Sequence, residues 1–492
     1  MRRALFLALL SALLAGCAVG PDYQRPLVSS PDRFRAQTGP TSGTTVEPDV
    51  DSAASLADRA WWEILQDETL KALIDEALRN GHDVRFAAWR MEEARANAGI
   101  ARSEFFPQIQ GDAGWSRGRQ SEFVSPITDT TNLYDVNLGL SWEIDLWGRI
   151  RRLNEAALAR YLATEEARRG VLLSLVSEVA TGYFQLRALD VELEIAQRTT
   201  TTFQQTHDLF SRRLEAGIAS GLETSSAAAS AATTAASIPD LQRQIAAQEN
   251  QLALLLGRNP GDVPRGAALN DQLLPPEIPA GIPSDLLKRR PDLRQAEQEL
   301  VAANADVGVA VADYFPSIRL TGAFGGVAPQ VDDLFGDGKV WSVGGGLLTP
   351  LFQGRRLKNQ HRAAVARWEQ AKVAYERSIN NAFVEVSTAL VAYHKLADVE
   401  REQSRAVASY REAVGLANSR YLSGLSDYLD VLQAQRQLFP AENALAQTRF
   451  DRLAVLARLY RALGGGWRLP DSGWTSPQGQ PREATRAGLV SR

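Results

Sequence analysis

The sequence predicts a mainly α-helical protein with a small set of membrane-crossing β-strands, built as an internal tandem duplication. Three observations lead to this prediction. Residues 134–146 alternate between apolar and polar side chains, residues 148–216 and 354–421 keep a helical period for longer than a globular helix does, and matching residues recur about 207 positions apart. Each half of the chain is therefore expected to carry a pair of strands and a long helical hairpin.

The alternation at 134–146 defines the clearest membrane strand. Tyr134 and Trp142 fall on the apolar parity, whereas Asp135 and Glu143 fall on the polar one. Successive side chains of a strand point to opposite faces, so one face is apolar and the other polar. The thirteen residues exceed the roughly 9 to 11 that a tilted strand needs to cross a bilayer. Taken alone, the stretch also fits the alternative of a half-buried strand in a soluble sheet.

The composition limits the class of protein. The chain has 492 residues, is 45% hydrophobic and carries a net charge of −4, so no global positive field argues for nucleic acid. Its four histidines lack metal-ligand spacing, and a single cysteine excludes a disulfide framework and a Cys-rich zinc site. The sequence contains no phosphate loop, nucleophile elbow or metal-binding spacing, so we expect no enzyme activity, no metal and no cofactor other than a covalent lipid.

The single cysteine, Cys17, follows a segment with the features of an export signal. Two arginines precede an apolar run, 4–14, that is too short to span a membrane, and small residues stand directly before the cysteine. This arrangement resembles a bacterial lipoprotein signal. The resemblance implies removal of residues 1–16, a lipid on Cys17, and sorting to the outer membrane because Ala18 rather than an aspartate follows. The alternative is a plain secretory signal with an incidental cysteine.

Residues 17–60 contain the lipid anchor and a stretch rich in Pro, Ser, Thr and Asp, which predicts an extended tether. No later stretch offers the roughly 18 consecutive apolar residues of a transmembrane helix. After processing, the chain can therefore cross a membrane only through β-strands that close into a barrel.

The first structural repeat is predicted at 61–260. It begins with two helices, the second of which ends before Pro107 because the residue preceding a proline is pushed out of the helical region. A strand pair follows at about 108–146. A long helical hairpin at about 148–257 then turns at Gly217.

The second structural repeat is predicted at 284–467, after a proline-rich connector at 261–283. It has a strand pair at about 317–352 and a long helical hairpin at about 354–464. The remaining residues, 468–492, are predicted to form a disordered tail.

Four membrane strands cannot close a barrel, because about eight are the minimum and lipid does not tolerate an open sheet edge. Copies of the chain must therefore pool their strands, as a dimer with eight or a trimer with twelve. The last long helix adds a constraint, since two adjacent apolar seams begin at Leu425 and Val431. A helix with two seams packs against a neighbour on each side, which favours a hollow cylinder of helices.

Five motifs recur together in a known family. They are residues 17–23 (CAVGPDY), Trp61-Trp62, residues 287–293 (LKRRPDL), residues 314–322 (YFPSIRLTG) and residues 462–467 (ALGGGW). Together they resemble the TolC-like outer-membrane factors, most closely the NodT-like lipoprotein branch, whose members are outer-membrane components of RND-type tripartite efflux systems.

The resemblance implies a homotrimer with a twelve-stranded transmembrane barrel and a trimeric α-barrel, anchored by lipid in the outer membrane of a Gram-negative bacterium. The helical tunnel would lie in the periplasm. The implied partners are outer-membrane lipid, a periplasmic adaptor (a membrane fusion protein) and an inner-membrane RND-type pump. The implied function is a passive exit channel for small molecules or ions.

The resemblance also assigns residues that dock the adaptor. In similar proteins the hairpin turns lie at the end of the tunnel and meet the adaptor. Gly217 and Gly424, which are 207 positions apart, match these turns, and Arg213 and Arg420 belong to the same tip motifs.

Just beyond the second turn, Leu429 and Asp430 match the constriction of similar channels. In a trimer each would form a ring, one apolar and one of three carboxylates that favours cations. Glu223 occupies the equivalent place in the first repeat, but Ser220 and Glu223 also have the spacing of a helix capping box. The position one turn after Asp430, often acidic in the family, is Gln433, so Asp430 is the expected acidic ring.

Two basic clusters follow the strand pairs: Arg149, Arg151 and Arg152 in the first repeat, and Arg355, Arg356 and Lys358 in the second. Cations at a helix N-terminus oppose the helix dipole, so a compensating negative charge is expected. Phospholipid headgroups at the periplasmic rim of the membrane could supply it. The alternative is simple solvation of the cations or their pairing with the nearby carboxylates of Asp145 and Asp313.

Two other functions share parts of this pattern. An exit duct for type I protein secretion has the same fold and differs in its partner, but the lipoprotein motifs favour efflux. A periplasmic coiled-coil adaptor has one helical hairpin beside a small β domain. This chain has two hairpins, each preceded by alternating strands, which argues against an adaptor.

Overall fold

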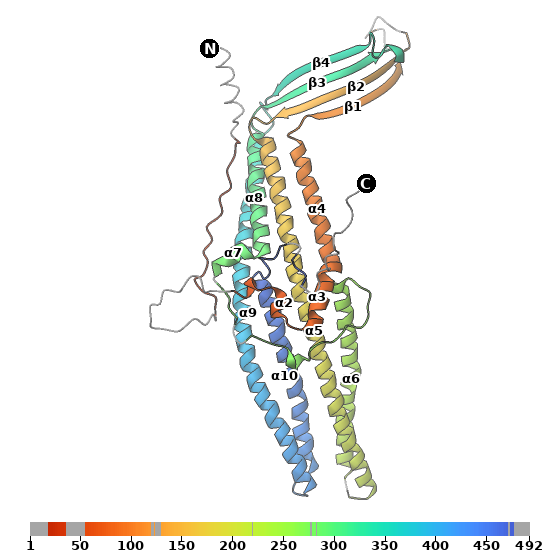
Figure 1. Ribbon diagram of the computed structural model, residues 1–492, viewed down its shortest axis with the longest axis vertical. Helices are drawn as coiled ribbons and strands as arrows, with labels where there is room; N and C mark the ends of the chain where they lie inside the picture. Colours follow the sequence, from red (N-terminus) through yellow and green to blue (C-terminus); the bar gives the residue numbers. More distant parts are fainter. Residues whose placement is uncertain are drawn as a thin grey trace, which may run out of the picture. The chain divides into compact units, whose positions relative to one another are not determined.

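The computed structural model describes residues 18–35, 55–119, 123, 129–218, 220–275, 278–281, 283–470 and 473–476 (Figure 1). The predicted signal, 1–16, and the predicted lipidation site, Cys17, lie outside the described residues. The chain divides into two compact units, each of which combines segments of both sequence repeats. Unit 1 comprises residues 1–28, 89–165 and 295–377, and unit 2 comprises residues 29–88, 166–294 and 378–492.

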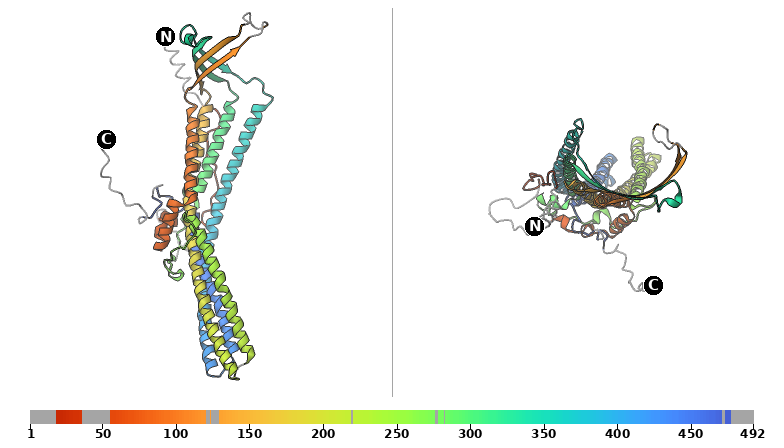
Figure 2. Two further views of the ribbon diagram at one scale, coloured as in Figure 1. Left: turned by 90° about the vertical axis from the view of Figure 1, so that its right-hand side faces the viewer. Right: turned by 90° about the horizontal axis from the view of Figure 1, so that it is seen from above.

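Unit 1 contains one antiparallel sheet, whose strands follow in the order β1 (Gln108–Gly118), β2 (Thr131–Ile144), β3 (Ser317–Ala328) and β4 (Lys339–Leu348). The four predicted strands are thus confirmed. β2 and β3 join the two pairs into a single sheet, with Trp142 opposite Leu320. Seen from above, this sheet is curved rather than flat (Figure 2).

The register extends the predicted alternation to all four strands, because paired residues share a face. One face carries apolar side chains: Ile109, Trp115, Tyr134, Leu138, Leu140, Trp142, Leu320, Phe324, Trp341, Val343 and Leu347. The other face is mainly polar or small: Asp112, Asn137, Ser141, Glu143, Arg319, Thr321 and Ser342. Its larger apolar side chains, Leu133, Val327, Val340 and Leu348, lie near the strand ends.

Unit 1 also contains most of α4 (His82–Ser103), most of α8 (Pro291–Ala312), and the first turns of α5 (Arg149–Glu215) and α9 (Arg356–Leu422). Val307 and Ala310 of α8 pack with Ala364 of α9 in a small apolar core. The Asp145 carboxylate accepts hydrogen bonds from two backbone N–H groups in the first turn of α5, at 3.1 and 2.9 Å. This cap allows the helix to begin directly after the strand.

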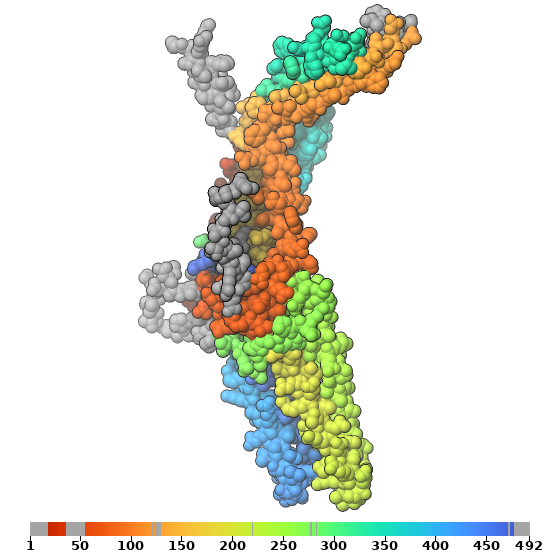
Figure 3. All heavy atoms as spheres, turned by 45° about the vertical axis from the view of Figure 1, so that its right-hand side comes forward, coloured from red at the N-terminus to blue at the C-terminus, as the bar shows by residue number. Residues whose placement is uncertain are grey.

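Unit 2 is built on two long helical hairpins, α5 with α6 (Gly221–Leu256) and α9 with α10 (Tyr428–Ala462). α5 and α9 have 67 residues each, as the long helical periods predicted. Figure 3 shows the free ends of the hairpins next to each other, α9–α10 in blue and α5–α6 in yellow to green. Ala227 and Ala231 of α6 are buried, and their small side chains allow neighbouring helices to approach closely.

Shorter elements complete unit 2: the helices α2 (Trp61–Ile64), α3 (Glu68–Asn80) and α7 (Leu286–Arg289), and the 3-10 turns Leu56–Asp58, Leu269–Asp271 and Pro283–Asp285. Asp67 caps α3 by accepting hydrogen bonds from the N–H groups of Thr69 and Leu70 at 2.9 and 3.2 Å. Across the part of the chain that the structure describes, no helix is both long and apolar enough to cross a bilayer. No group of potential metal-ligating side chains is found there either.

The prediction of a disordered tail at 468–492 is wrong for residues 473–476. Trp474 is buried, and its carbonyl accepts a hydrogen bond from the indole N–H of Trp61 at 2.8 Å. The backbone N–H of Ser476 donates to the buried Asp75 carboxylate at 2.8 Å. The buried Trp474 ring and the hydrogen bonds to Trp61 and Asp75 offset the entropy of ordering so short a segment, although its local composition is that of a loop. Residues 477–492 lie outside the described residues.

Candidate functional site at the hairpin tips

The first hairpin turns at Gly217, whose backbone is left-handed with a φ of 73°. The Gly217 N–H donates to the Leu214 carbonyl and the Ile218 N–H donates to the Arg213 carbonyl, both at 2.9 Å. This pair of bonds closes the C-terminus of α5 as a Schellman motif. A side chain at this φ would be strained, which accounts for a glycine at the predicted tip.

The second hairpin turns in the same way. Gly424 has a φ of 70°, its N–H donates to the Tyr421 carbonyl, and the Leu425 N–H donates to the Arg420 carbonyl, again at 2.9 Å. The predicted docking residues therefore occupy matching places, with each glycine in a turn and each arginine in the preceding helical turn. The duplication seen in the sequence extends to individual backbone bonds.

Arg213 and Tyr421 join the two hairpins. The Arg213 guanidinium donates a hydrogen bond to the Tyr421 hydroxyl and lies 5.4 Å from the centroid of its ring. The Tyr421 ring lies 5.3 Å from that of Tyr428, which packs 4.5 Å from Phe210 of α5. Arg420, the counterpart of Arg213, is exposed, so the matching arginines differ in their surroundings.

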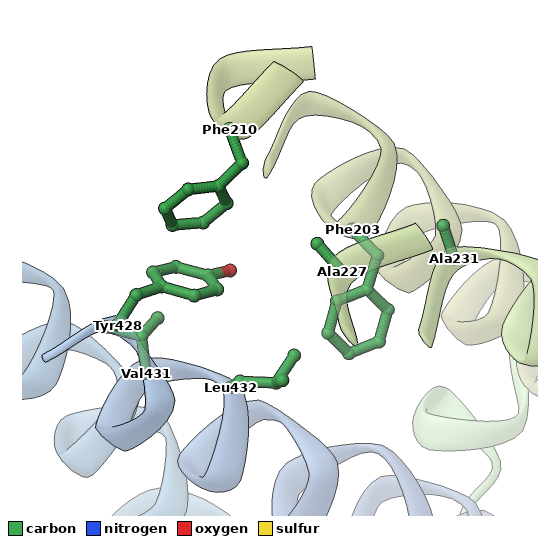
Figure 4. Packing of buried hydrophobic residues seen from close by; sticks show 7 residues of the cluster. All are labelled: Phe203, Phe210, Ala227, Ala231, Tyr428, Val431 and Leu432. Carbon is green, nitrogen blue, oxygen red and sulfur yellow. The ribbon is translucent and has the colours of Figure 1, made fainter. Parts of the chain in front are cut away.

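A buried apolar cluster, called the tip cluster below, holds α5, α6 and α10 together behind the turns. It consists of Phe203, Phe210, Ala227, Ala231, Tyr428, Val431 and Leu432 (Figure 4). Figure 4 shows the Tyr428 ring facing Phe210, with Val431 and Leu432 on the same side of α10. Burial raises the pKa of the Tyr428 hydroxyl, so it stays neutral inside the cluster.

The predicted gate residues lie on the outward side of α10. The tip cluster includes Tyr428, Val431 and Leu432. Successive side chains of an α-helix are rotated by about 100° around its axis, so Leu429 and Asp430 point away from the cluster. Leu429 is 50% exposed and Asp430 is exposed. A leucine and a carboxylate held at the free end of a hairpin can contact another copy of the chain or line a path for water and ions.

Glu223, the predicted second acidic gate residue, is engaged in helix capping. Its carboxylate accepts a hydrogen bond from the Ser220 N–H at 2.8 Å, and the Ser220 hydroxyl accepts one from the Glu223 N–H at 3.3 Å. The predicted capping box is thus confirmed. At the start of α10 the N-cap residue, Asp427, makes no side-chain cap bond. The two repeats therefore use their acidic residues differently, and Asp430 is the better gate candidate.

The sequence analysis missed Glu442, a buried carboxylate farther along α10. It accepts hydrogen bonds from Arg198 of α5 and from Arg411 of α9, both at 2.6 Å, and so links three helices. All three side chains line a cavity of about 540 Å³. The sequence does contain a signal for this site. Glu442 lies between Leu438 and Leu445, which continue the predicted apolar seam that begins at Val431. A carboxylate buried in such a seam needs cationic partners.

The first basic cluster is paired with carboxylates. Arg149 donates to Glu143 at 2.7 and 3.0 Å, and Arg151 donates to Asp145 at 3.2 Å. Arg152 donates to the carboxylates of Asp22 and Glu155 at 2.7 and 2.9 Å. Carboxylates therefore compensate the charges of this cluster, although the main partner of Arg149 is Glu143, which was not predicted.

The second basic cluster differs. Arg356 donates hydrogen bonds to the side-chain oxygens of Gln353 and Gln360. Within the described parts of the chain, neither Arg355, Arg356 nor Lys358 forms an ion pair. Burial raises the pKa of the predicted alternative partner, Asp313, and the charge of Arg356 acts in the opposite direction. Lipid headgroups and solvation or pairing with Asp313 therefore both stay predictions for this cluster.

The apolar face of the sheet is a second functional surface. Trp341 is 73% exposed, Val343 82% and Ile109 69%, although soluble proteins bury most side chains of these three types. A continuous apolar surface of this kind marks contact with a partner or with a membrane.

Comparison with known proteins agrees with this geometry. The family model described as outer membrane efflux protein matches residues 73–258 and 282–465, one stretch in each repeat. The solvent efflux pump outer membrane protein SrpC of Pseudomonas putida is 37% identical over 459 residues, which cover 92% of this chain and 96% of the relative. The cation efflux system protein CusC of Escherichia coli O6:H1 is 35% identical over 458 residues, covering 92% and 97%.

A solved structure extends the likeness to the fold. The open state of the Neisseria gonorrhoeae MtrE outer membrane channel matches with a TM-score of 0.80 at 32% identity, covering 92% of this chain and 99% of that one. Relatives and structure span both repeats, including the strands and both hairpins. The chain therefore belongs to the outer membrane efflux protein family and is the outer-membrane channel component of an efflux system.

Proposed function

We propose that this protein is the passive exit channel of a tripartite efflux pump and works as a homotrimer. The observation that carries the proposal is the sheet. Among the described residues, β1 and β4 each pair on one side only, and one face of the sheet is apolar. An unpaired edge in lipid leaves backbone groups without hydrogen bonds, so β1 of one copy must pair with β4 of the next.

Three copies suit a conduit better than two. Eight strands enclose a lumen that side chains fill, whereas twelve strands can enclose water. In the trimer the apolar face would meet lipid, the polar face would line the lumen of a twelve-stranded barrel, and the helical hairpins would form a periplasmic tunnel. A lipid on Cys17 would add an anchor in the outer membrane.

The partners are a periplasmic adaptor and an inner-membrane RND-type pump. The adaptor would dock at the hairpin tips, where Arg213, Gly217, Arg420 and Gly424 occupy matching positions in the two turns. The cargo is a small molecule or an ion, in line with relatives named for a solvent efflux pump and a cation efflux system. Leu429 and Asp430 would form the gate at the same end.

Purified full-length protein in detergent tests the assembly. Light scattering should give a protein mass three times that of the chain, and the same material should open water-filled pores in planar bilayers. A monomeric or dimeric mass, or a trimer without conductance, would contradict the channel. In cells, loss of the gene should increase sensitivity to small toxic compounds; loss of a secreted protein with unchanged sensitivity would point to type I secretion instead.

A further inference from the structure

The first described residues, 18–25, are called the strap below, and they begin at the turn between β2 and α5. The Val19 N–H donates to the Trp147 carbonyl at 3.0 Å. Gly148, with a φ of 80°, lies so close that a Cβ there would be 2.6 Å from the Cα of Ala18. The start of the strap is thus packed on the backbone that leaves the sheet.

The strap then follows α8 away from the sheet. Gly20 has a φ of 95°, and a Cβ on it would be 2.6 Å from the Cα of Gly308. The buried Asn304 donates through its side-chain amide to the Pro21 carbonyl at 2.9 Å. Farther along, Glu297 holds the next residues of the strap. Since these contacts pass from 308 to 304 to 297, the strap runs antiparallel to α8, and its first residue lies at the end of α8 that leads into β3.

Buried charges fasten the strap at two points. The Arg152 side chain is 6% exposed and donates to the Asp22 carboxylate at 2.7 Å. Glu297 is buried and accepts two hydrogen bonds from Arg25, at 2.6 and 2.5 Å, and one from the Tyr23 hydroxyl at 3.2 Å. Burial, together with the Glu297 carboxylate, raises the pKa of Tyr23. Buried charged groups need such partners, so Arg152 of α5 and Glu297 of α8 are suited to hold this segment.

The strap changes what a lipid on Cys17 would do. An extended tether would let the folded protein move freely below its anchor. Here only one peptide bond separates Cys17 from Ala18, so the docked strap leaves almost no free chain between the anchor and the folded unit.

We propose that the docked strap fixes the acylated N-terminus at the junction of β2 and α5, and that this rigid coupling promotes insertion of the strands into the outer membrane. The inference rests on the proposed lipidation of Cys17 and goes beyond it, because the lipid alone would not be sufficient. A flexible link lowers the effective concentration of the sheet at the bilayer to which the lipid is attached.

Two insertion variants test the effect of the docked strap while they keep the lipidation site. A short flexible Gly-Ser linker between Ala18 and Val19 adds slack while it keeps Cys17, Ala18 and every strap contact from Val19 onward. The same linker between Leu27 and Val28, beyond the end of the strap, is the matched control. We expect the first insertion to lower the amount of SDS-resistant trimer in outer-membrane fractions severalfold, and the control to assemble as the wild type does.

A third variant undocks the strap without added residues. Asp22→Asn combined with Arg25→Ala removes both charged strap contacts. The two side chains are 90% and 51% exposed. Arg152 keeps its bond to Glu155 and Glu297 keeps the one from Tyr23, so we expect the helices to stay intact, which far-UV circular dichroism can verify. We expect it to lower trimer assembly as the first insertion does.

Mass spectrometry of the N-terminal peptide must accompany these measurements. Assembly that matches the wild type in both the slack and the undocked variants, with lipid present on Cys17, would overturn the coupling and leave the lipid anchor standing. An unmodified Cys17 in the wild-type protein would overturn the anchor and the coupling together.

Discussion

Asp430 and Glu223 occupy equivalent positions in the two repeats, but only Glu223 is bound to the backbone of its own helix. The charge at the constriction of the proposed trimer would therefore come from Asp430. We predict that Asp430→Ala increases the conductance of the closed trimer, because the ring loses three carboxylates and becomes wider. Single-channel recording in planar bilayers measures the change. Asp427→Ala removes a nearby acid from the same helix start and should leave conductance unchanged; an unchanged Asp430→Ala channel would reject the gate.

The contact between Arg213 and Tyr421 is the second residue-scale feature, since it links hairpins from different repeats. We predict that Arg213→Ala increases closed-state conductance more than Tyr421→Phe. The arginine change removes the hydrogen bond and the cation–π contact, each worth about 0.5–1 kcal/mol, whereas the phenylalanine keeps the ring. Arg420→Ala, at the matching exposed position, is the control. Equal conductance for Arg213→Ala and Arg420→Ala would show that the contact does not hold the tip closed.

At the scale of elements, ion pairs fasten α9 to α10. Glu400 of α9 accepts hydrogen bonds from Arg449 and Arg452 of α10. Burial alone would raise the pKa of Glu400, but the hydrogen bonds from Arg452 and Arg449 outweigh it and hold the pKa below its ordinary value. The folded state thus favours the ionised carboxylate. The ionised Glu400 carboxylate therefore stabilises the folded state fully at pH values above the ordinary glutamate pKa. This stabilisation disappears as the pH falls through the lowered pKa of the folded state.

We therefore predict that Glu400→Gln lowers the free energy of unfolding by about 1–2 kcal/mol at neutral pH. The difference from the wild type should shrink as the pH falls below about 4, where the wild-type carboxyl also becomes protonated. Thermal unfolding of the detergent-solubilised protein at several pH values measures it. Glu402→Gln, in an exposed pair with Arg405, should have little effect at any pH. A pH-independent loss for Glu400→Gln would contradict the assignment.

The elements differ in how far the sequence could predict them. The strands, long helices, glycine turns and the Ser220 capping box each carry their signal within a few residues, and all were predicted. The segment around Trp474 and the partners of Glu442 were not, because their contacts join residues far apart in the chain. A periodic pattern shows that a side chain is buried, but it does not show which distant segment covers it.

At the scale of the whole molecule, the duplication and the compact units follow different boundaries. Each repeat supplies two strands and one hairpin, yet both units combine residues of both repeats. The packed helices of each unit thus come from both repeats. The matching turns at Gly217 and Gly424 have kept their backbone geometry, whereas the side chains around them have diverged. In a trimer of such chains, all six hairpins would have a similar backbone, whereas each side-chain environment would occur only three times.

The proposed membrane orientation depends on the two faces of the sheet, and neighbouring residues of β4 can test it. Val343 lies on the apolar face near the middle of the strand, and Ser342 lies on the polar face. We predict that Val343→Arg strongly reduces the trimer recovered from outer membranes, because an arginine facing lipid near the midplane costs about 2–4 kcal/mol per copy.

Ser342→Arg places the same side chain one residue away, where the proposed lumen contains water, and should assemble almost as the wild type does. Quantitative immunoblotting of heat-resistant trimer in outer-membrane fractions compares the two variants at equal expression. Both variants add the same side chain to the same strand. A difference in the amount of trimer therefore results from the face of the sheet on which the arginine lies. Equal assembly would mean that the apolar face does not meet lipid, and a larger loss for Ser342→Arg would mean that the orientation is reversed.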